Sequence, residues 1–260
     1  MRVTRQQTER MIRYEDAEVI VVHKPPFLAV ETRDARQQDL VSLLVNRRVS
    51  MEEAAFIGVV HRLDQPVEGL LVLAKTKEAA ATLSAGLRAG DFAKEYLAVV
   101  QGVTEESGTL VHTLKKDGKT NTSAVVPAGT DGGKEARLSY ERLAVMDQKS
   151  LLRICLDTGR HHQIRVQFSA IGHPLVGDAK YGGCDDEGCG CGSDGGNEKI
   201  KGCGGIGGPR TQNSSHTWTG QPLALCSSRL VFTHPGTKEV MEFHAMPAGA
   251  GFEEWKGALG

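Results

Sequence analysis

The chain has 260 residues, of which 40% are hydrophobic and 24% are charged, and its formal net charge is −1. These values are typical of a globular protein with a full hydrophobic core, and they argue against a protein that coats nucleic acid through bulk positive charge. No apolar stretch approaches the roughly 20 residues that span a bilayer, and the first residues lack the apolar core of a signal peptide, so no membrane partner is expected.

The first predicted elements are apolar runs with clear boundaries. Residues 17–26, "AEVIVVHKPP", are rich in β-branched side chains and end at a double proline, which predicts a strand with a firm stop. Residues 69–76, "GLLVLAKT", predict a buried strand. In residues 77–90 apolar side chains recur every four positions before a glycine, which predicts a helix, and residues 93–102 predict another strand.

The second half of the chain continues with more strands than helices. Its predicted elements are antiparallel strands at 137–146 and 150–159, a helix at 160–172, and a closing hairpin with strands at 223–235 and 238–247. Many strands with few helices, joined mostly as meanders, predict an α+β fold with a mixed, largely antiparallel sheet and a few flanking helices.

Residues 182–208 differ from the rest, because they contain many glycines and almost no apolar side chains. We therefore expect a flexible insertion. Its cysteines, Cys184, Cys189, Cys191 and Cys203, are spaced C-x4-C-x-C-x11-C. Four thiolates could hold Zn²⁺, but this spacing is not a usual zinc pattern, so an unligated loop is preferred over metal binding or redox pairing. Six cysteines without a signal peptide indicate reduced thiols or metal ligands in a cytoplasmic protein.

Four short motifs occur in a fixed order along the chain. They are "HRLD" at 61–64, "KEYL" at 94–97, "TGRHHQIRVQFSAIGHPLVGDAKYG" at 158–182 and "LALCSSRLVFTHP" at 223–235. This ordered set resembles the RluA-type pseudouridine synthases, in which "HRLD" surrounds the catalytic aspartate. The resemblance runs from about residue 15 to about residue 247, leaving out the Gly/Cys-rich insertion.

The resemblance implies a reaction and four site residues. Asp64 matches the catalytic aspartate, and Tyr96 matches the tyrosine that stacks on the target base. Arg165 matches the arginine that pairs with the aspartate, and Arg62 matches the basic residue that helps to extrude the target nucleotide. The implied reaction is isomerisation of a specific uridine in ribosomal or transfer RNA. The N-glycosidic bond breaks, the base turns, and a C–C bond forms at C5, with no cofactor.

The chemistry of these residue types agrees with that reaction. A carboxylate can form a covalent adduct or abstract a proton without a cofactor. A guanidinium in a bidentate pair would favour its anion and fix its direction. A stacked base must flip out before it can react, and it then needs an aromatic or apolar wall. Attack at C1′, attack at C6 and proton abstraction from C2′ all use the same carboxylate and remain open.

Four further residues near these motifs are candidates for substrate binding, namely His61, Arg160, His162 and Gln163. A structural role competes at three of them. His61 is favoured as a hydrogen-bonding residue at the entrance of the strand, and His162 and Gln163 are favoured as supports for the predicted helix. Lys24 and Lys75 could contact phosphate, but a solvated lysine is the default expectation.

The sequence also departs from the family pattern. Pro66-Val67-Glu68-Gly69 replaces the usual Thr-Ser-Gly step after "HRLD", so a carboxylate stands where hydroxyls are expected. His161 stands where a threonine is common, and Cys226 stands where a histidine is common. These departures indicate a divergent branch and do not identify an RNA target.

We divide the chain into an N-terminal extension at 1–15, a catalytic domain at 16–247 and a C-terminal tail at 248–260. Only about 15 residues precede the first predicted strand, so RNA recognition is expected to rest on the catalytic domain, its loops or a partner. A monomer is the default expectation. The alternative functions are a catalytically inactive RNA-binding or RNA-chaperone relative, and a glycosidase with Glu68 as its second carboxyl group.

Overall fold

A computed structural model describes residues 3–182 and 222–259 of the chain. Apart from Gly182, the Gly/Cys-rich insertion predicted at 182–208 lies outside the described residues. So do its four cysteines, and the proposed metal site is therefore not tested by the structure. None of the helices in the described ranges is long and apolar enough to cross a membrane.

The strands are β1 (Ile12–Glu15), β2 (Val19–Lys24), β3 (Gly58–Val59), β4 (Glu68–Ala74), β5 (Ala93–Gln101), β6 (Ser107–Asp117), β7 (Thr122–Val126), β8 (Lys134–Met146), β9 (Lys149–Leu156), β10 (Leu225–Thr233) and β11 (Val240–His244). The helices are α1 (Arg5–Met11), α2 (Leu40–Val49), α3 (Lys77–Ala89), α4 (Gln163–Ala170) and the 3-10 helix η1 (Ala250–Ala258).

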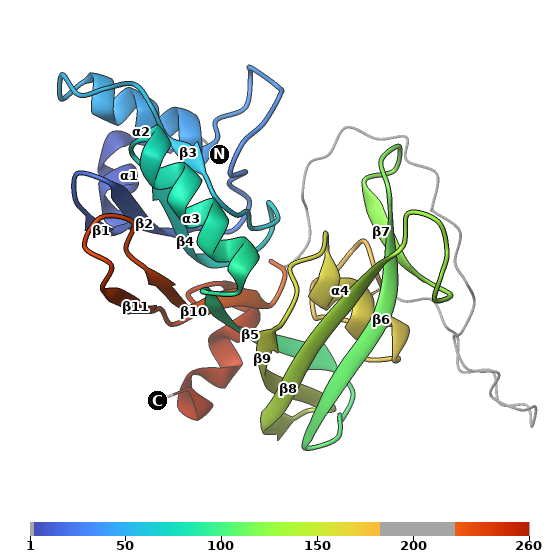
Figure 1. Ribbon diagram of the computed structural model, residues 1–260. Coiled ribbons are helices and arrows are strands. Elements are labelled where there is room, and N and C mark those ends of the chain that lie inside the picture. Colours follow the sequence, from blue (N-terminus) through green and yellow to red (C-terminus); the bar gives the residue numbers. More distant parts are fainter. Residues whose placement is uncertain (1–2, 183–221, 260) are drawn as a thin grey trace, which may run out of the picture.

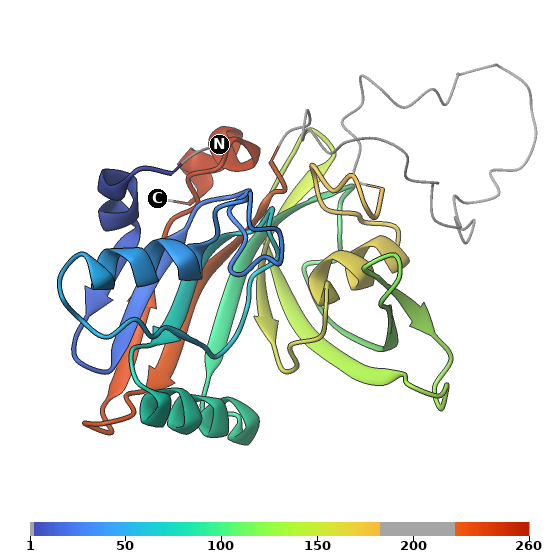
Figure 2. The same ribbon diagram turned by 90° about the horizontal axis from the view of Figure 1, so that it is seen from above.

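All of these strands belong to one sheet. Its order is β1-β2-β4-β10-β5-β9-β8-β6-β7, with β11 paired to β10 and β3 paired to β4. The pairing of β10 with β4 is parallel, and the other strand pairs are antiparallel. The sheet curves through both halves of the molecule, with α1, α2 and α3 in one half and α4 in the other (Figures 1 and 2). The predicted mixed, largely antiparallel fold is confirmed.

The buried strand at the centre of one half is β4, in which every residue is buried. Because side chains alternate between the two faces of a sheet, Leu71 and Leu73 pack into one core cluster and Leu70 and Val72 into another. Helix α2 contributes Leu40 and Leu44 to the first cluster, and α3 contributes Ala79 and Leu83 to the second. The apolar run after "HRLD" is therefore buried on both faces, which makes it a rigid support for the residues before it.

The predicted helix at 160–172 is shorter in the structure, because α4 begins only at Gln163. His162 precedes it in the left-handed backbone region, with φ 55°. The structure also contains elements that the sequence did not indicate, namely α1, α2, β1, β3, β6, β7 and η1. Strand β6 is one example, because its burial pattern is mostly exposed or intermediate and ends in three exposed residues.

The two ends of the chain pack onto the same sheet. Strand β1 pairs with β2, and Met11 of α1 is buried in the core. In η1, Phe252 and Trp255 are buried against Leu97 and Val99 of β5. The predicted division into extension, domain and tail stays a prediction, although both flanking segments share the core of the domain.

Candidate active site

The turn that carries Asp64 lies between β3 and β4 and is held by a buried lysine. The Val67 N–H donates to the Asp64 carbonyl oxygen at 3.0 Å. The ammonium group of Lys24, at the end of β2, donates to the carbonyl oxygens of Pro25, Leu28 and Gln65 at 3.0, 2.8 and 3.1 Å. Burial lowers the pKa of Lys24 to about 7, although the charges of Asp64 and Glu68 oppose this shift.

The expectation that Lys24 and Lys75 are solvated is wrong, because both are buried. Each has local partners that a sequence does not reveal. The three carbonyl oxygens around Lys24 match the three donors of an ammonium group. Lys75 pairs with Glu15 at 2.7 Å and donates to the Asp16 carbonyl oxygen. Both lysines therefore hold loops together inside the protein.

Asp64 and Arg165, which are 101 positions apart, meet in the structure. Nη1 of Arg165 donates to Oδ2 of Asp64 at 3.2 Å, and the Asp64 side chain is 27% exposed. The bidentate contact of this arginine is with a different residue, Asp178, whose oxygens accept from Nε at 2.8 Å and Nη2 at 2.7 Å. Asp178 is buried and also accepts the backbone N–H groups of Lys180 and Tyr181.

Sequence analysis did not identify Asp178. The only available signal was its place in "GDAKYG", within the long motif at 158–182. Burial alone would lower the pKa of Arg165, but its hydrogen bonds and ion pairs with Asp178 and Asp64 hold the pKa well above its ordinary value. The guanidinium group therefore stays charged and is fixed by Asp178, and Nη1 donates to Asp64.

His162 and Tyr181 complete the polar surroundings of Asp64. Nε2 of His162 lies 3.6 Å from Oδ2 of Asp64, and Nδ1 lies 2.6 Å from the Tyr181 hydroxyl oxygen. Burial and the neighbouring charge of Arg165 lower the pKa of His162 to about 2. Burial raises the pKa of Tyr181 to about 12, and the Arg165 guanidinium lies 5.1 Å from the centre of its ring. Imidazole and phenol are thus both neutral near pH 7.

Tyr96 lies on β5 and is almost fully buried in the main core cluster. Burial raises the pKa of its phenol above the ordinary value, and the negative charge of Asp64 adds to this effect, while the Ser227 side chain opposes it. The charge of Asp64 therefore acts on the Tyr96 phenol. A neutral hydroxyl group can act as a hydrogen-bond donor.

The two residues before Leu63 lie in different environments. Arg62 is 69% exposed and pairs with Glu31 at 2.6 Å. His61 is buried, its Nε2 accepts the Val72 N–H at 3.4 Å, and its ring meets Phe92 edge-on. Burial lowers the pKa of His61 to about 3. This position favours the structural role of His61 over contact with RNA.

Gln163 and Arg160 belong to the turn that leads into α4. Oε1 of Gln163 accepts from the Thr158 hydroxyl at 2.8 Å and from the Arg160 N–H at 2.9 Å, and Nε2 donates to the Arg137 carbonyl oxygen at 3.0 Å. The amide of Gln163 is therefore used inside the protein, which favours a supporting role. Arg160 is exposed, and its Nε donates to the Glu135 carbonyl oxygen.

His161, one of the departures from the family pattern, connects α4 to the β6–β7 hairpin. Its ring stacks on that of His162 with 3.7 Å between ring centres. Nδ1 lies 2.9 Å from the Ser123 hydroxyl oxygen, and Nε2 lies 3.1 Å from Oδ1 of Asn121. A threonine at this position could not span both contacts, because its side chain is much shorter.

Glu68, which belongs to the unusual stretch after "HRLD", holds the C-terminal segment. It is buried, and its carboxylate oxygens accept the N–H groups of Ala248 and Gly249 at 3.1 and 2.9 Å. These amides directly precede η1, so the carboxylate ties the segment before this helix to β4, 180 positions earlier along the chain. Since both oxygens are engaged by backbone groups, Glu68 is not placed to act as the second carboxyl group of a glycosidase.

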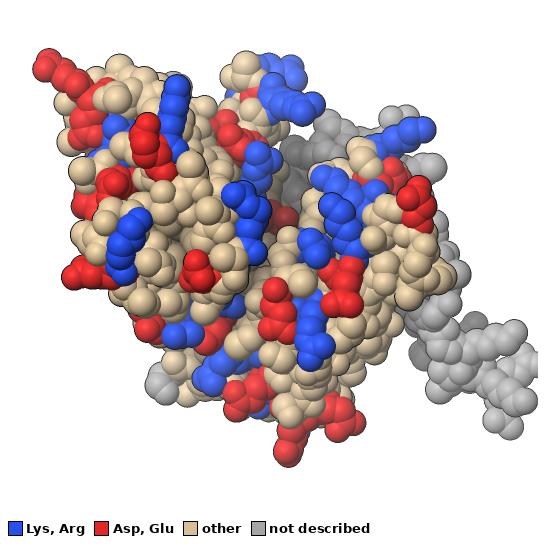
Figure 3. Space-filling view, viewed as in Figure 1, with Lys and Arg blue, Asp and Glu red and all other residues tan. Residues whose placement is uncertain are grey.

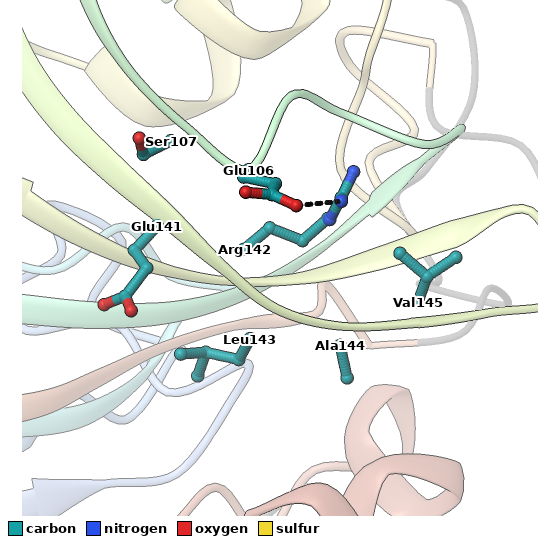
Figure 4. Close-up of a pocket in the computed structure, with 7 residues that line it drawn as sticks. All are labelled: Glu106, Ser107, Glu141, Arg142, Leu143, Ala144 and Val145. Carbon is teal, nitrogen blue, oxygen red and sulfur yellow. Dashed lines mark ion pairs between the residues drawn. The ribbon is translucent and has the colours of Figure 1, made fainter.

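A hollow of about 660 Å³ lies on a different part of the surface (Figure 4). Figure 4 shows Glu106 and Arg142 on one side of it, joined by an ion pair of 3.9 Å. The residues that line it are Glu106, Ser107, Glu141, Arg142, Leu143, Ala144 and Val145. None of them belongs to the group around Asp64, so this hollow is not the candidate site.

Comparison with known proteins identifies similar chains. The family model for RNA pseudouridylate synthase matches residues 18–170. Ribosomal large subunit pseudouridine synthase D from Pseudomonas aeruginosa is 38% identical over 179 residues, covering 68% of this chain and 55% of that protein. The protein of the same name from Vibrio cholerae is 33% identical over 237 residues, covering 89% of this chain and 65% of that protein. The chain thus spans between about half and two thirds of these relatives.

Two solved structures share the fold. Human RNA pseudouridylate synthase domain containing 4 has a TM-score of 0.67 at 18% identity, covering 94% of this chain and 91% of that chain. Human RNA pseudouridylate synthase domain containing 1 has a TM-score of 0.62 at 23% identity, covering 91% of this chain and 82% of that chain.

Proposed function

The chain belongs to the RNA pseudouridylate synthase family, and from this premise we propose that it isomerises uridine to pseudouridine in ribosomal RNA, with Asp64 as its catalytic carboxylate. The observation that carries the proposal is the group Asp64–Arg165–Asp178, in which a partly exposed carboxylate is oriented by a buried arginine. In the reaction the N1–C1′ bond breaks, the detached base rotates, and C5 bonds to C1′. The proton on C5 is lost and N1 gains one, so product and substrate are isomers and no cofactor is required.

Each residue of the site has a role in this scheme. Asp64 acts at the junction of sugar and base, and the Arg165 guanidinium group orients it. Tyr96 supplies the wall against which the flipped base rests, and its neutral hydroxyl remains a donor. Arg62, exposed on the loop before β4 and paired with Glu31, fills the place of the extruded nucleotide.

The surface near Asp64 suits a polyanion despite the net charge of −1. Lys and Arg side chains lie on both sides of the groove between the two halves of the molecule, which is distinct from the hollow in Figure 4 (Figure 3). Lys116 and Lys180 are exposed, and the positive charge of each lowers the pKa of the neighbouring His161. Such cations attract the phosphate backbone without reading its sequence.

Ribosomal RNA is the proposed substrate because the two relatives described above are named for the large ribosomal subunit. Transfer RNA is the second candidate substrate.

The cytoplasmic location and the monomeric state remain predictions from the sequence. The alternative of an inactive RNA-binding relative would not require the intact ion pair between Asp64 and Arg165.

The test uses cells in which the gene is deleted and then restored as wild type, Asp64→Asn or Asp131→Asn. Pseudouridines are mapped in ribosomal and transfer RNA. We expect one or more uridines of ribosomal RNA to lose modification on deletion, and wild type and Asp131→Asn to restore it, because Asp131 lies in an exposed turn. The Asp64→Asn variant should restore nothing, and purified Asp64→Asn should be at least about 10³-fold slower while still binding RNA.

Two results would contradict the proposal. Modification by Asp64→Asn at a rate within tenfold of wild type would exclude Asp64 as the catalytic group. Loss of sites in transfer RNA alone would transfer the proposal to the second candidate substrate.

A further inference from the structure

The carboxylate of Asp64 is held asymmetrically. Of its contacts with the described residues, the ion pair with Nη1 of Arg165 at 3.2 Å and the approach of Nε2 of His162 at 3.6 Å both involve Oδ2. An arginine N–H on one oxygen, with a ring nitrogen close to the same oxygen, sets the orientation of a carboxylate. The side chain is 27% exposed, and Oδ1 takes part in neither contact, so Oδ1 is the oxygen that we assign to an incoming nucleotide.

The hydrogen bonds around Tyr181 decide which nitrogen of His162 carries the proton. The Tyr181 oxygen accepts the Ser123 N–H at 2.9 Å, and the same oxygen lies 2.6 Å from Nδ1 of His162. If the hydroxyl donates to Nδ1, the neutral ring carries its proton on Nε2, facing Oδ2 of Asp64. The opposite tautomer would direct a lone pair at a carboxylate, which is repulsive. The assignment therefore follows from the hydrogen-bond network.

The backbone of His162 supports a dedicated orientation. Its φ of 55° and ψ of 25° lie in the left-handed region, which is less favourable for a histidine than ordinary helical backbone. Its side chain makes no capping hydrogen bond to α4. The conformation instead directs the ring between Tyr181 and Asp64, where His161 stacks on it at 3.7 Å.

Building on the proposed function, we infer that His162 is a positioning residue for Asp64. Its Nε2–H faces Oδ2 across 3.6 Å and so leaves Oδ1 to the flipped nucleotide. Tyr181 and Ser123 fix the tautomer of the imidazole, and His161 fixes its plane by stacking and by its contacts with Ser123 and Asn121 of the β6–β7 hairpin. His161, which stands where the family often has a threonine, thus connects this hairpin to His162 and through it to Asp64.

The first test compares two substitutions of nearly equal shape. His162→Gln keeps an N–H donor at a reach similar to Nε2, whereas His162→Met has the same length and no donor. We expect His162→Met to lower kcat by about 10- to 100-fold with KM changed less than threefold, and His162→Gln to recover most of that loss. Equal kcat values for the two variants would overturn the inference, because a purely structural role does not distinguish a donor from a thioether.

The second test needs no activity. In protein labelled with ¹⁵N-histidine, long-range ¹H–¹⁵N spectra distinguish the two neutral tautomers from the cation. We expect the Nε2–H tautomer for His162 at pH 7, and loss of this preference in Tyr181→Phe. An Nδ1–H tautomer or an imidazolium in the wild type would overturn the inference.

The two proposals fail in different ways. A wild-type protein that modifies no RNA contradicts the proposed function, while the tautomer is still measured. If both His162 variants fail to fold, Tyr181→Phe replaces them, with an expected fall in kcat of about 5- to 10-fold in protein that circular dichroism shows to be folded. Full activity of a folded Tyr181→Phe would then contradict the inference.

Discussion

At the scale of single residues, the division of labour within Arg165 explains how a surface-accessible carboxylate is held still. The bidentate contact, which is the stronger and more directional one, goes to buried Asp178. Only one N–H reaches Asp64. Because the guanidinium group is fixed by a residue that substrate does not touch, its position does not depend on whether Asp64 is free or engaged.

Replacing Asp178 by asparagine should therefore damage both stability and catalysis. The substitution keeps the shape but leaves Arg165 as a buried cation without its main counter-charge. Removing one partner of a buried ion pair typically costs about 3–5 kcal/mol. We expect a loss of unfolding free energy in this range by urea denaturation, and a fall in kcat larger than any change in KM.

The matched control is Asp157→Asn. Asp157 pairs with Arg137 at 3.0 Å, but both side chains are 53% exposed. Exposed ion pairs contribute at most about 1 kcal/mol, so the free energy of unfolding of this variant should be close to that of the wild type. Similar stability losses for the two variants would show that Asp178 does not anchor Arg165.

At the scale of elements, the unusual sequence after "HRLD" connects β4 to the C-terminal helix. Glu68 begins β4 and accepts two N–H groups before η1. Gly69 follows with φ 120°, and a Cβ atom there would lie 2.4 Å from the backbone of Ser227, so only glycine allows β4 and β10 to approach. The same short stretch thus forms the sheet contact and ties η1 to it.

Replacing Glu68 by serine, the residue type expected from the family, should loosen this tie. A serine is too short to reach both amides, and leaving buried donors unpaired costs roughly 1–3 kcal/mol. We expect hydrogen exchange at Ala248 and Gly249 to become at least about tenfold faster. Activity should stay within a few-fold, because Glu68 makes no contact with Asp64 among the hydrogen bonds of the described residues.

Glu254→Ser is the control for this experiment, since Glu254 is exposed on η1 itself. It should leave exchange at Ala248 and Gly249 unchanged. Unchanged exchange in Glu68→Ser as well would mean that the buried aromatic side chains of η1 hold the segment without help from Glu68.

At the scale of the whole molecule, buried neutral histidines make the fold sensitive to acid. Burial lowers the pKa of His23 to about 4, of His61 to about 3 and of His162 to about 2. The unfolded chain binds protons at these side chains below a pKa of about 6.5, whereas the folded chain does not. The contribution of these histidines to the free energy of unfolding is therefore fully present above about pH 6.5. It is lost as the pH decreases toward their pKa values in the folded protein.

His61 provides the clearest measurement, because it is buried and its contacts are with Val72 and Phe92 and not with Asp64. Its contribution should fall by about 2 kcal/mol between pH 8 and pH 5. Replacing His61 by glutamine, which can still accept the Val72 N–H, should reduce the acid-induced loss of stability by about this amount in urea denaturation at the two pH values. His244→Gln, at a side chain that is 68% exposed, is the control. If His61→Gln loses as much stability between pH 8 and pH 5 as the wild type, the acid sensitivity does not come from His61.

The local pattern was sufficient for the elements that carry a strong signal. Strands β2, β4, β5, β8, β9, β10 and β11 and helices α3 and α4 were all anticipated, because each has apolar side chains at the period of its element. Elements such as α2 and β6 were missed, because charged and polar side chains interrupt their apolar pattern. Their burial is decided by the sheet and by neighbouring segments rather than by their own periodicity.

By itself, the sequence determined the fold class and the family, and it predicts Asp64, Tyr96 and Arg165 as site residues, because these depend on short motifs in a fixed order. Only the tertiary structure decided what holds them. Lys24 proved to be buried, Asp178 to be the anchor of Arg165, and Glu68 to hold the segment that leads into η1. The physical reason is that the environment of a charged side chain depends on partners that are distant in sequence, such as the amides 180 positions from Glu68.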